Sequence, residues 1–78
     1  MPTVLRGGPY RVYFFSHESN EPAHVHVDRA GSTAKFWLGP VEPARNSGFS
    51  PREMTRIRRI LISHEARLQE AWNDLFEA

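Results

Sequence analysis

The residues best suited to chemistry in this chain lie close together, between positions 16 and 27. This stretch holds three of the four histidines, His17, His24 and His26, together with the carboxylates of Glu18 and Glu21. Imidazole titrates near neutral pH and is also a common metal ligand. We therefore expect the catalytic or metal-binding groups of this protein to come mainly from this stretch.

One hypothesis is a metal site at His24 and His26. The residues around them alternate between polar and apolar, which predicts a strand, and residues two apart on a strand point to the same face. Two imidazoles side by side can bind one Zn²⁺ or a similar divalent ion. His17, Glu18 or Glu21 could reach the metal from the preceding loop. A histidine pair on an exposed face can also bind nothing, so other hypotheses stay open.

A second hypothesis is acid–base chemistry on RNA, a ribonuclease-like activity. His24 or His26 can take the proton of a ribose 2′-hydroxyl while another group protonates the leaving oxygen. Lys35, expected opposite His26, could stabilise the charge that develops around phosphorus. Glu18 or Glu21 could orient a histidine. Aromatic side chains available to stack on bases are Tyr13, Phe15 and Trp37.

Two further hypotheses need no catalysis. The histidine face could bind a protein partner or a second copy of the chain, because an open aromatic face is often an interface. Alternatively, the histidines could be structural, closing loops and pairing with Glu18 or Asp28. The residues alone leave the choice among these hypotheses open.

A small sheet must position these residues. Runs of β-branched and aromatic residues between turns predict strands, and a capped amphipathic run predicts a helix. The expected strands lie near 3–6, 10–16, 24–29 and 32–38, with a possible edge strand at 41–45 and one long helix at 51–76. This pattern predicts an α+β fold in one domain, residues 1–78. An antiparallel sheet of about four strands would carry the helix on one face.

The histidine strand is expected to form a hairpin with the next strand through a tight turn at Ala30 and Gly31. The expected cross-strand pairs are Val27 with Ala34 and Val25 with Phe36 on one face, and His26 with Lys35 and His24 with Trp37 on the other. Both strands then agree on which face is apolar, which supports the hairpin.

The expected helix begins with a capping box of Ser50 at the N-cap, Pro51 at the first helical position and Glu53. Its charges oppose the helix dipole, since arginines crowd the N-terminal half and acids the C-terminal half. The arginines expected to bind nucleic acid or a partner are Arg52, Arg56 and Arg59. Acids elsewhere, or Glu53, could instead neutralise them.

His64 lies in the apolar stripe of this helix, which is typical of a core histidine with one satisfied hydrogen bond. If the helix covers the valine face of the sheet, His64 lies across the sheet from His24 and His26. The three histidines could not then form one site.

Composition narrows the possible functions. The 78-residue chain has no cysteine, which excludes a disulfide framework and a thiolate site. A net charge of +1 does not by itself indicate a polyanion partner. No secretory leader or long apolar run is recognisable, so we expect a cytoplasmic protein with no membrane partner.

Several segments, in this order, are similar to those of one known family. They are M-P-T-V-L-R at 1–6, Y-R-V-Y-F-F-S at 10–16, N-E-P-A-H-V-H-V at 20–27, A-K-F-W-L at 34–38 and A-R-N-S-G-F-S at 44–50. With the closing run that holds His64 and Trp72, they resemble the small bacterial family catalogued as domain of unknown function 4160. The resemblance covers nearly the whole chain, and the E-P-x-H-V-H-V core gives it much of its specificity.

The resemblance implies no established catalytic residue. It does imply a gene that forms half of a compact pair, in the style of a toxin–antitoxin system, with a small partner protein encoded nearby. We therefore expect a component of such a pair that acts on or binds RNA through the histidine strand, with Lys35 and the helix arginines holding phosphate. The alternatives are a non-enzymatic module that binds a partner or forms a homodimer, and a His-x-His metal-binding domain.

Overall fold

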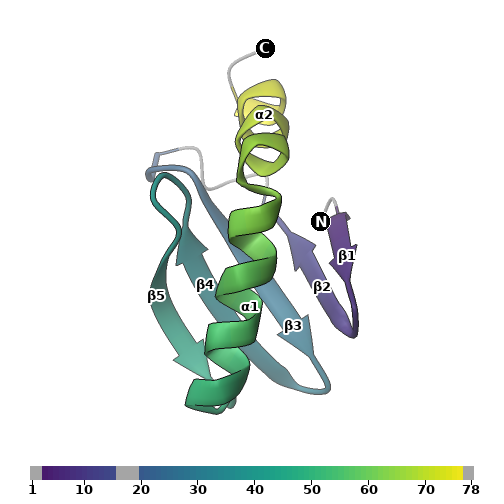
Figure 1. Ribbon diagram of the computed structural model, residues 1–78. Coiled ribbons are helices and arrows are strands. Elements are labelled where there is room, and N and C mark those ends of the chain that lie inside the picture. The colour runs from purple at the N-terminus through teal and green to yellow at the C-terminus, as the bar shows by residue number, and fades with distance from the viewer. Residues whose placement is uncertain (1–2, 16–19, 77–78) are drawn as a thin grey trace.

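A computed structural model of the protein describes residues 3–15 and 20–76, with the backbone alone for residues 3–7. Five antiparallel strands form one sheet in the order β1-β2-β3-β4-β5, and two helices follow (Figure 1). The elements are β1 (Thr3–Gly7), β2 (Tyr10–Tyr13), β3 (His24–Arg29), β4 (Ser32–Trp37), β5 (Glu42–Ser47), α1 (Pro51–Ser63) and α2 (Glu65–Phe76). The α+β fold class is therefore confirmed, and the fifth strand corresponds to the possible edge strand expected at 41–45.

The hairpin of β3 and β4 has the register that the alternation predicts. The observed pairs are His24 with Trp37, Val25 with Phe36, His26 with Lys35 and Val27 with Ala34. Both turn residues have positive φ, 48° at Ala30 and 86° at Gly31, as a tight hairpin turn requires. On its other side β3 pairs with β2, so the histidine strand lies at the centre of the sheet.

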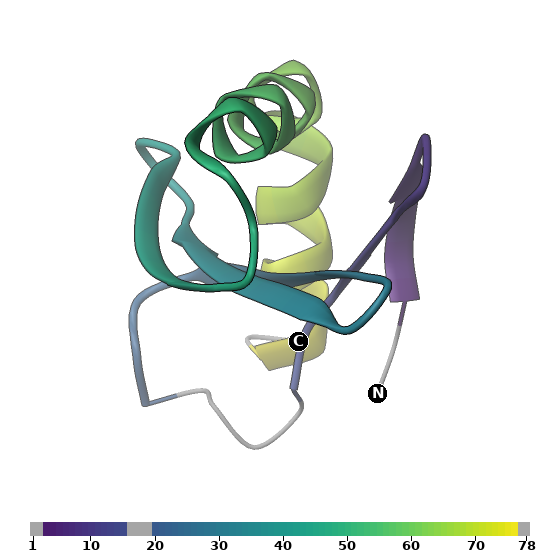
Figure 2. The ribbon, with the colours of Figure 1, turned by 90° about the horizontal axis from the view of Figure 1, so that it is seen from below.

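The valine face of the sheet holds the core. Val25 and Val27 of β3 are fully buried in a cluster that includes Ile57 and Leu61 of α1. Figure 2 shows α1 lying on one side of the sheet. Burying a side chain of this kind contributes about 1.5–3 kcal/mol, so this layer supplies much of the stability of a small fold.

The edge strand β5 spans Glu42–Ser47, whereas the sequence indicated 41–45. Every residue of β5 is exposed, and Pro43 is tolerated because an edge strand can lose a donor. A register shift between Lys35 and Phe36 accompanies the pairing of β4 with β5. Strand β2 ends at Tyr13, so it is shorter than the strand expected over 10–16.

The prediction of one helix over 51–76 is wrong, because the helix breaks at His64. The imidazole Nδ1 donates to the carbonyl of Ile60 at 2.9 Å, and the backbone N–H of His64 donates to Leu61 at 3.1 Å. A histidine that satisfies the last carbonyls is a favourable helix end. The apolar stripe continues on both sides of the break, so periodicity alone could not reveal it.

The break redirects α2 toward the end of the sheet. Figure 2 shows α2 running from the side of α1 to the level of the sheet. Trp72 of α2 thereby contacts both Phe14, at 5.5 Å between ring centroids, and His24, at 5.0 Å. Neither helix in the described part of the chain is long and apolar enough to cross a membrane.

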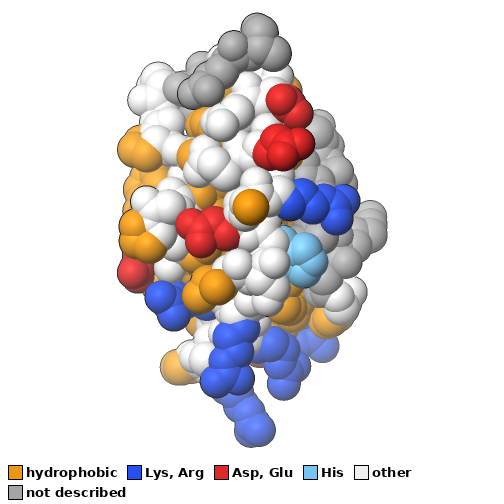
Figure 3. Space-filling view, turned by 45° about the horizontal axis from the view of Figure 1, so that its top comes forward, with side chains coloured by type: hydrophobic (Ala, Val, Ile, Leu, Met, Phe, Trp, Pro, Cys, Tyr) orange, Lys and Arg blue, Asp and Glu red, His pale blue; other side chains and the backbone are white. Residues whose placement is uncertain are grey.

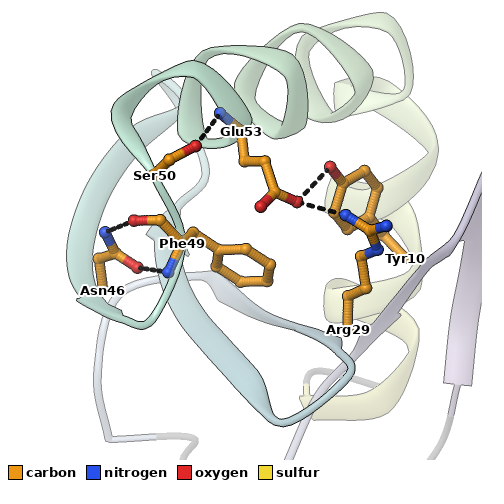
Figure 4. A network of polar contacts seen from close by, with 6 residues as sticks. All are labelled: Tyr10, Arg29, Asn46, Phe49, Ser50 and Glu53. Atoms are coloured by element: carbon orange, nitrogen blue, oxygen red, sulfur yellow. Dashed lines mark hydrogen bonds and ion pairs between the residues drawn. The ribbon is translucent and has the colours of Figure 1, made fainter.

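The capping box at the start of α1 is half formed. The Ser50 hydroxyl accepts the backbone N–H of Glu53 at 3.1 Å, as expected. The Glu53 carboxylate instead pairs with Arg29 at 2.7 Å and accepts the Tyr10 hydroxyl at 3.1 Å (Figure 4). The hydrogen bond from Arg29 lowers the pKa of Glu53. This carboxylate therefore ties α1 to β3 rather than closing its own helix end.

Candidate functional site

The two strand histidines project together from the face of the sheet that α1 does not cover. His24 and His26 have ring centroids 5.3 Å apart, and the alternating valines lie in the core on the other face. The geometric prediction for H-x-H is therefore confirmed. We call this side of the sheet the histidine face.

His26 is held between aromatic rings of the histidine face. Its imidazole stacks on Tyr13, with centroids 5.5 Å apart and planes 23° apart, and meets Phe15 at 4.5 Å in an edge arrangement. Only 7% of His26 is exposed, yet the residue lines a surface hollow. This packing fixes the orientation of the imidazole at the wall of the hollow.

His24 occupies a different environment, although it is only two residues away. It has no exposed surface, and its Nδ1 donates to the carbonyl of Pro22 at 2.8 Å. Trp72 lies at 5.0 Å and Trp37 at 5.8 Å between ring centroids. Burial at this depth opposes the expected acid–base role of His24 on a substrate as large as RNA, because its ring is sealed from the surface. Its position points instead to fixing the start of β3.

Lys35 extends along the histidine face opposite His26. Its ammonium pairs with the carboxylate of Glu21 and lies 4.6 Å from the ring centroid of Trp37. Glu21, expected to orient a histidine, thus binds the lysine. Because Lys35 is only 8% exposed, this pair holds its charge in a defined place.

A hollow of about 440 Å³ lies at the centre of the histidine face. Its lining residues are Tyr13, Phe15, His26, Thr33, Ala34, Lys35, Arg45 and Ser47. The hollow therefore combines aromatic rings, one imidazole, two cations and the hydroxyls of Tyr13, Thr33 and Ser47. Such a set can stack a planar group and hold an anion beside it.

Three polar lining residues, Thr33, Arg45 and Ser47, were absent from the site expected from the sequence. They come from β4 and β5, where Lys35 pairs with Arg45 and Thr33 pairs with Ser47. A correct register for β5 would have found them, because cross-strand partners share a face. Arg45 is exposed and stands at the edge of the hollow.

Tyr13 is fixed at one wall of the hollow by a polar contact. Its hydroxyl donates to Asp28 at 2.9 Å, and the Arg11 guanidinium lies 4.7 Å from its ring centroid. Burial, and next the hydrogen bond with Asp28, raise the pKa of Tyr13. The hydroxyl therefore stays protonated at neutral pH, so Tyr13 is not suited to general-base chemistry and instead supports His26 at the wall of the hollow.

The helix arginines do not join this hollow. Arg52, Arg56 and Arg59 lie on the outer side of α1, across the sheet from the histidine face, around a separate hollow of about 380 Å³. Figure 3 shows Lys and Arg side chains gathered at the lower end of the molecule, where α1 begins. Lys35 and these arginines, which were all expected to hold phosphate, therefore lie on opposite sides of the sheet.

Of the ligands expected in the zinc hypothesis, His24 and His26 lie side by side. Glu21 pairs with Lys35, and His17 and Glu18 lie outside the described residues. Within residues 3–15 and 20–76, no three His, Cys, Asp or Glu side chains come together as a metal site would require. His64 is on α1's side of the sheet, so it does not complete a three-histidine site either.

Comparison with known proteins gives one family and little else. No curated protein and no solved structure matches the chain. The family model described as domain of unknown function (DUF4160) matches residues 9–73, which include every described lining residue of the hollow. The chain therefore belongs to the DUF4160 family.

Proposed function

We propose that this protein binds single-stranded RNA in the hollow of the histidine face, as one component of a toxin–antitoxin-like pair. The observation that carries the proposal is the lining of the hollow, where aromatic rings and two cations share one concave surface. Single-stranded nucleic acids are bound by this combination, since bases stack on rings and phosphates pair with Lys or Arg.

Two parts of the hollow would bind different groups of the RNA. A base would stack against Phe15, the partly exposed ring of the hollow, where stacking contributes about 1–3 kcal/mol per base. A neighbouring phosphate would meet Arg45 and Lys35, with the hydroxyls of Thr33 and Ser47 beside them. Because Lys35 is paired with Glu21, the phosphate would compete with that carboxylate, and Arg45 would make the larger contribution.

His26 is the group best placed for a chemical step on the bound RNA. Its imidazole would take the 2′-hydroxyl proton, the 2′-oxygen would attack the adjacent phosphorus, and the bond to the 5′-oxygen would break. Water would return a proton to that oxygen, giving a 2′,3′-cyclic phosphate and a 5′-hydroxyl. Lys35 and Arg45 would stabilise the charge on the phosphorus oxygens.

Binding can be tested by fluorescence anisotropy with a labelled single strand of about 10 nucleotides. We expect affinity to fall with added salt, and Arg45→Ala to weaken binding by about tenfold, as for loss of one charged hydrogen bond. Arg67→Ala removes the same charge from the exposed surface of α2 and serves as the matched control. Equal affinity of the two variants would refute this binding mode.

Chemistry is tested separately from binding. Incubation of a longer RNA with the protein should yield fragments ending in 2′,3′-cyclic phosphate, and His26→Gln should abolish them while RNA affinity stays within about threefold. Growth arrest on induced expression, lost in His26→Gln but kept in Arg67→Ala, is the corresponding result in cells. RNA binding without cleavage or arrest would leave a binding module and remove the ribonuclease-like step.

A second candidate function is a non-enzymatic module that binds a partner protein or a second copy through the same face. It is favoured by the aromatic centre of the histidine face, where Tyr13 and Phe15 pack edge to face with centroids 5.4 Å apart. Light scattering during size-exclusion chromatography distinguishes the cases. A dimer mass that Phe15→Asp converts to a monomer, with no affinity for RNA, would favour the interaction module.

A further inference from the structure

The outer face of α1 carries a row of cations that the proposed RNA site does not use. Arg52, Arg56 and Arg59 are exposed, and with Thr55 they line a hollow of about 380 Å³. Their spacing of four and three residues places them one helical turn apart on one face. We call these three residues the arginine row.

Two acids on or beside α1 have other partners. Glu53 pairs with Arg29 at 2.7 Å and accepts the Tyr10 hydroxyl, and Glu42 lies 4.0 Å from Arg58. In the part of the chain that the structure describes, no ion pair reaches the arginine row. Glu53 also interacts electrostatically with Arg56, but its hydrogen bond with Arg29 is the larger interaction, so among the described residues the row keeps most of its positive charge.

The position of the row makes this charge costly for the protein alone. Arg52 lies in the first turn of α1 and opposes the helix dipole, and like charges one turn apart repel. An anionic partner would relieve both effects at once. Binding would thus be favoured by the removal of repulsion in addition to new ion pairs.

We propose that the arginine row docks an acidic helical segment of a partner protein. Residues four and three apart on α1 rise by about 6 and 4.5 Å along its axis. Aspartates or glutamates at the same intervals on an antiparallel helix would meet each arginine in turn. Thr55 lies between them, with its hydroxyl donating to the carbonyl of Pro51 at 3.1 Å.

An apolar residue at the end of the row favours a protein over a nucleic acid. Ile62 is 45% exposed, although most large apolar residues of the described chain are buried. It lies three residues after Arg59 and seven after Thr55, so it continues the same face of α1. A partner helix can offer an apolar side chain to Ile62, whereas a phosphate backbone cannot.

This surface is independent of the RNA site. α1 packs against the valine face, and the hollow with His26 and Arg45 opens on the other side of the sheet. RNA and an acidic partner could therefore occupy the protein at the same time.

The probe for the test is a labelled synthetic helical peptide of about four turns, with a leucine one turn before glutamates at i, i+3 and i+7 on the same face, so that in the antiparallel orientation the leucine meets Ile62. A peptide of the same composition, with the glutamates spread around the helix, is the matched control. We expect the striped peptide to bind at least fivefold more tightly than the scrambled one, roughly as three exposed ion pairs allow. Added salt should reduce this difference.

Variants locate the binding site on the protein. Replacing Arg52, Arg56 and Arg59 together by Ala should remove the preference for the striped peptide, and Ile62→Ala should weaken it. Arg67→Ala should leave it unchanged. Thermal unfolding should show the triple variant to be at least as stable as the wild type, because repulsion is removed.

Two outcomes would overturn the proposal. One is equal binding of striped and scrambled peptides. The other is a loss of RNA affinity in the triple variant with unchanged peptide binding, which would make the row part of a nucleic-acid surface. Failure of the proposed RNA site can be told apart from these outcomes, because Arg45→Ala is expected to change RNA affinity and not peptide affinity.

Discussion

The two faces of strand β3 have different environments, although the same six residues form both. On one face, Val25 and Val27 are buried in an apolar layer under α1. On the other, His24 and His26 are also buried, but by aromatic rings and by the tip of α2. Alternation therefore assigns each residue to a face, whereas the elements packed around that face decide what the residue can do.

The histidine face itself is divided along its length. Near His24 it is closed by Trp72 and Trp37, and near His26 it opens into the hollow that Arg45 borders. One part of the face thus resembles a second small core, while the other is available to a ligand. This division can be tested by comparing substitutions on the two faces and then within the histidine face.

The largest expected difference is between the covered face and the open one. Phe36→Ala removes a fully buried ring from the apolar layer and should cost about 3–5 kcal/mol of unfolding free energy. Phe15→Ala removes a partly exposed ring from the hollow and should cost about 1 kcal/mol. Urea unfolding followed by circular dichroism measures both. Equal losses would mean that the histidine face is as much a core as the valine face.

A smaller difference is expected between the two histidines. His24→Ala leaves a cavity beside Trp72 and leaves the carbonyl of Pro22 without its hydrogen-bond donor. The change should cost about 2–4 kcal/mol of unfolding free energy. His26→Ala mainly loses ring contacts with Tyr13 and Phe15, which should cost about 1–2 kcal/mol of unfolding free energy. Urea midpoints rank the two variants, and a shift of tryptophan emission should accompany the His24 change alone.

A control separates packing from hydrogen bonding at position 24. His24→Asn keeps a nitrogen donor near the place of Nδ1, so it should recover part of the stability that His24→Ala loses. If His26→Ala proves to be the more destabilising change, the division of the histidine face described above is wrong.

The local pattern of the sequence predicts the hairpin well, because its determinants are local. Strict alternation from His24 to Asp28 and a tight turn at Ala30 and Gly31 define the register that the structure has. The N-cap of Ser50 is predictable for the same reason, since its hydroxyl needs only a backbone N–H three residues away. Neither feature depends on the rest of the fold.

The features that could not be predicted from the sequence depend on tertiary contacts. The break at His64 combines a side-chain bond to Ile60 with the docking of Trp72, and neither changes the apolar stripe. The strand β5 is polar and wholly exposed, so it has no period to detect. Arg45 was missed with it, because its place opposite Lys35 follows from that register.

The smallest expected effect concerns the polar link that joins α1 to β3 on the covered face. The hydrogen bond from Arg29 lowers the pKa of Glu53 in the folded protein. Because the folded pKa is depressed, the contribution of Glu53 to stability is present above its unfolded pKa and is lost as the pH falls through the folded pKa. Glu53→Gln should therefore lower the urea midpoint near neutral pH, and this difference from the wild type should shrink in acid. Glu70→Gln, an exposed carboxylate on α2, is the matched control. If the difference in urea midpoint does not change with pH, the covered face is held by apolar packing and not by this ion pair. The contrast between the two faces would then be larger.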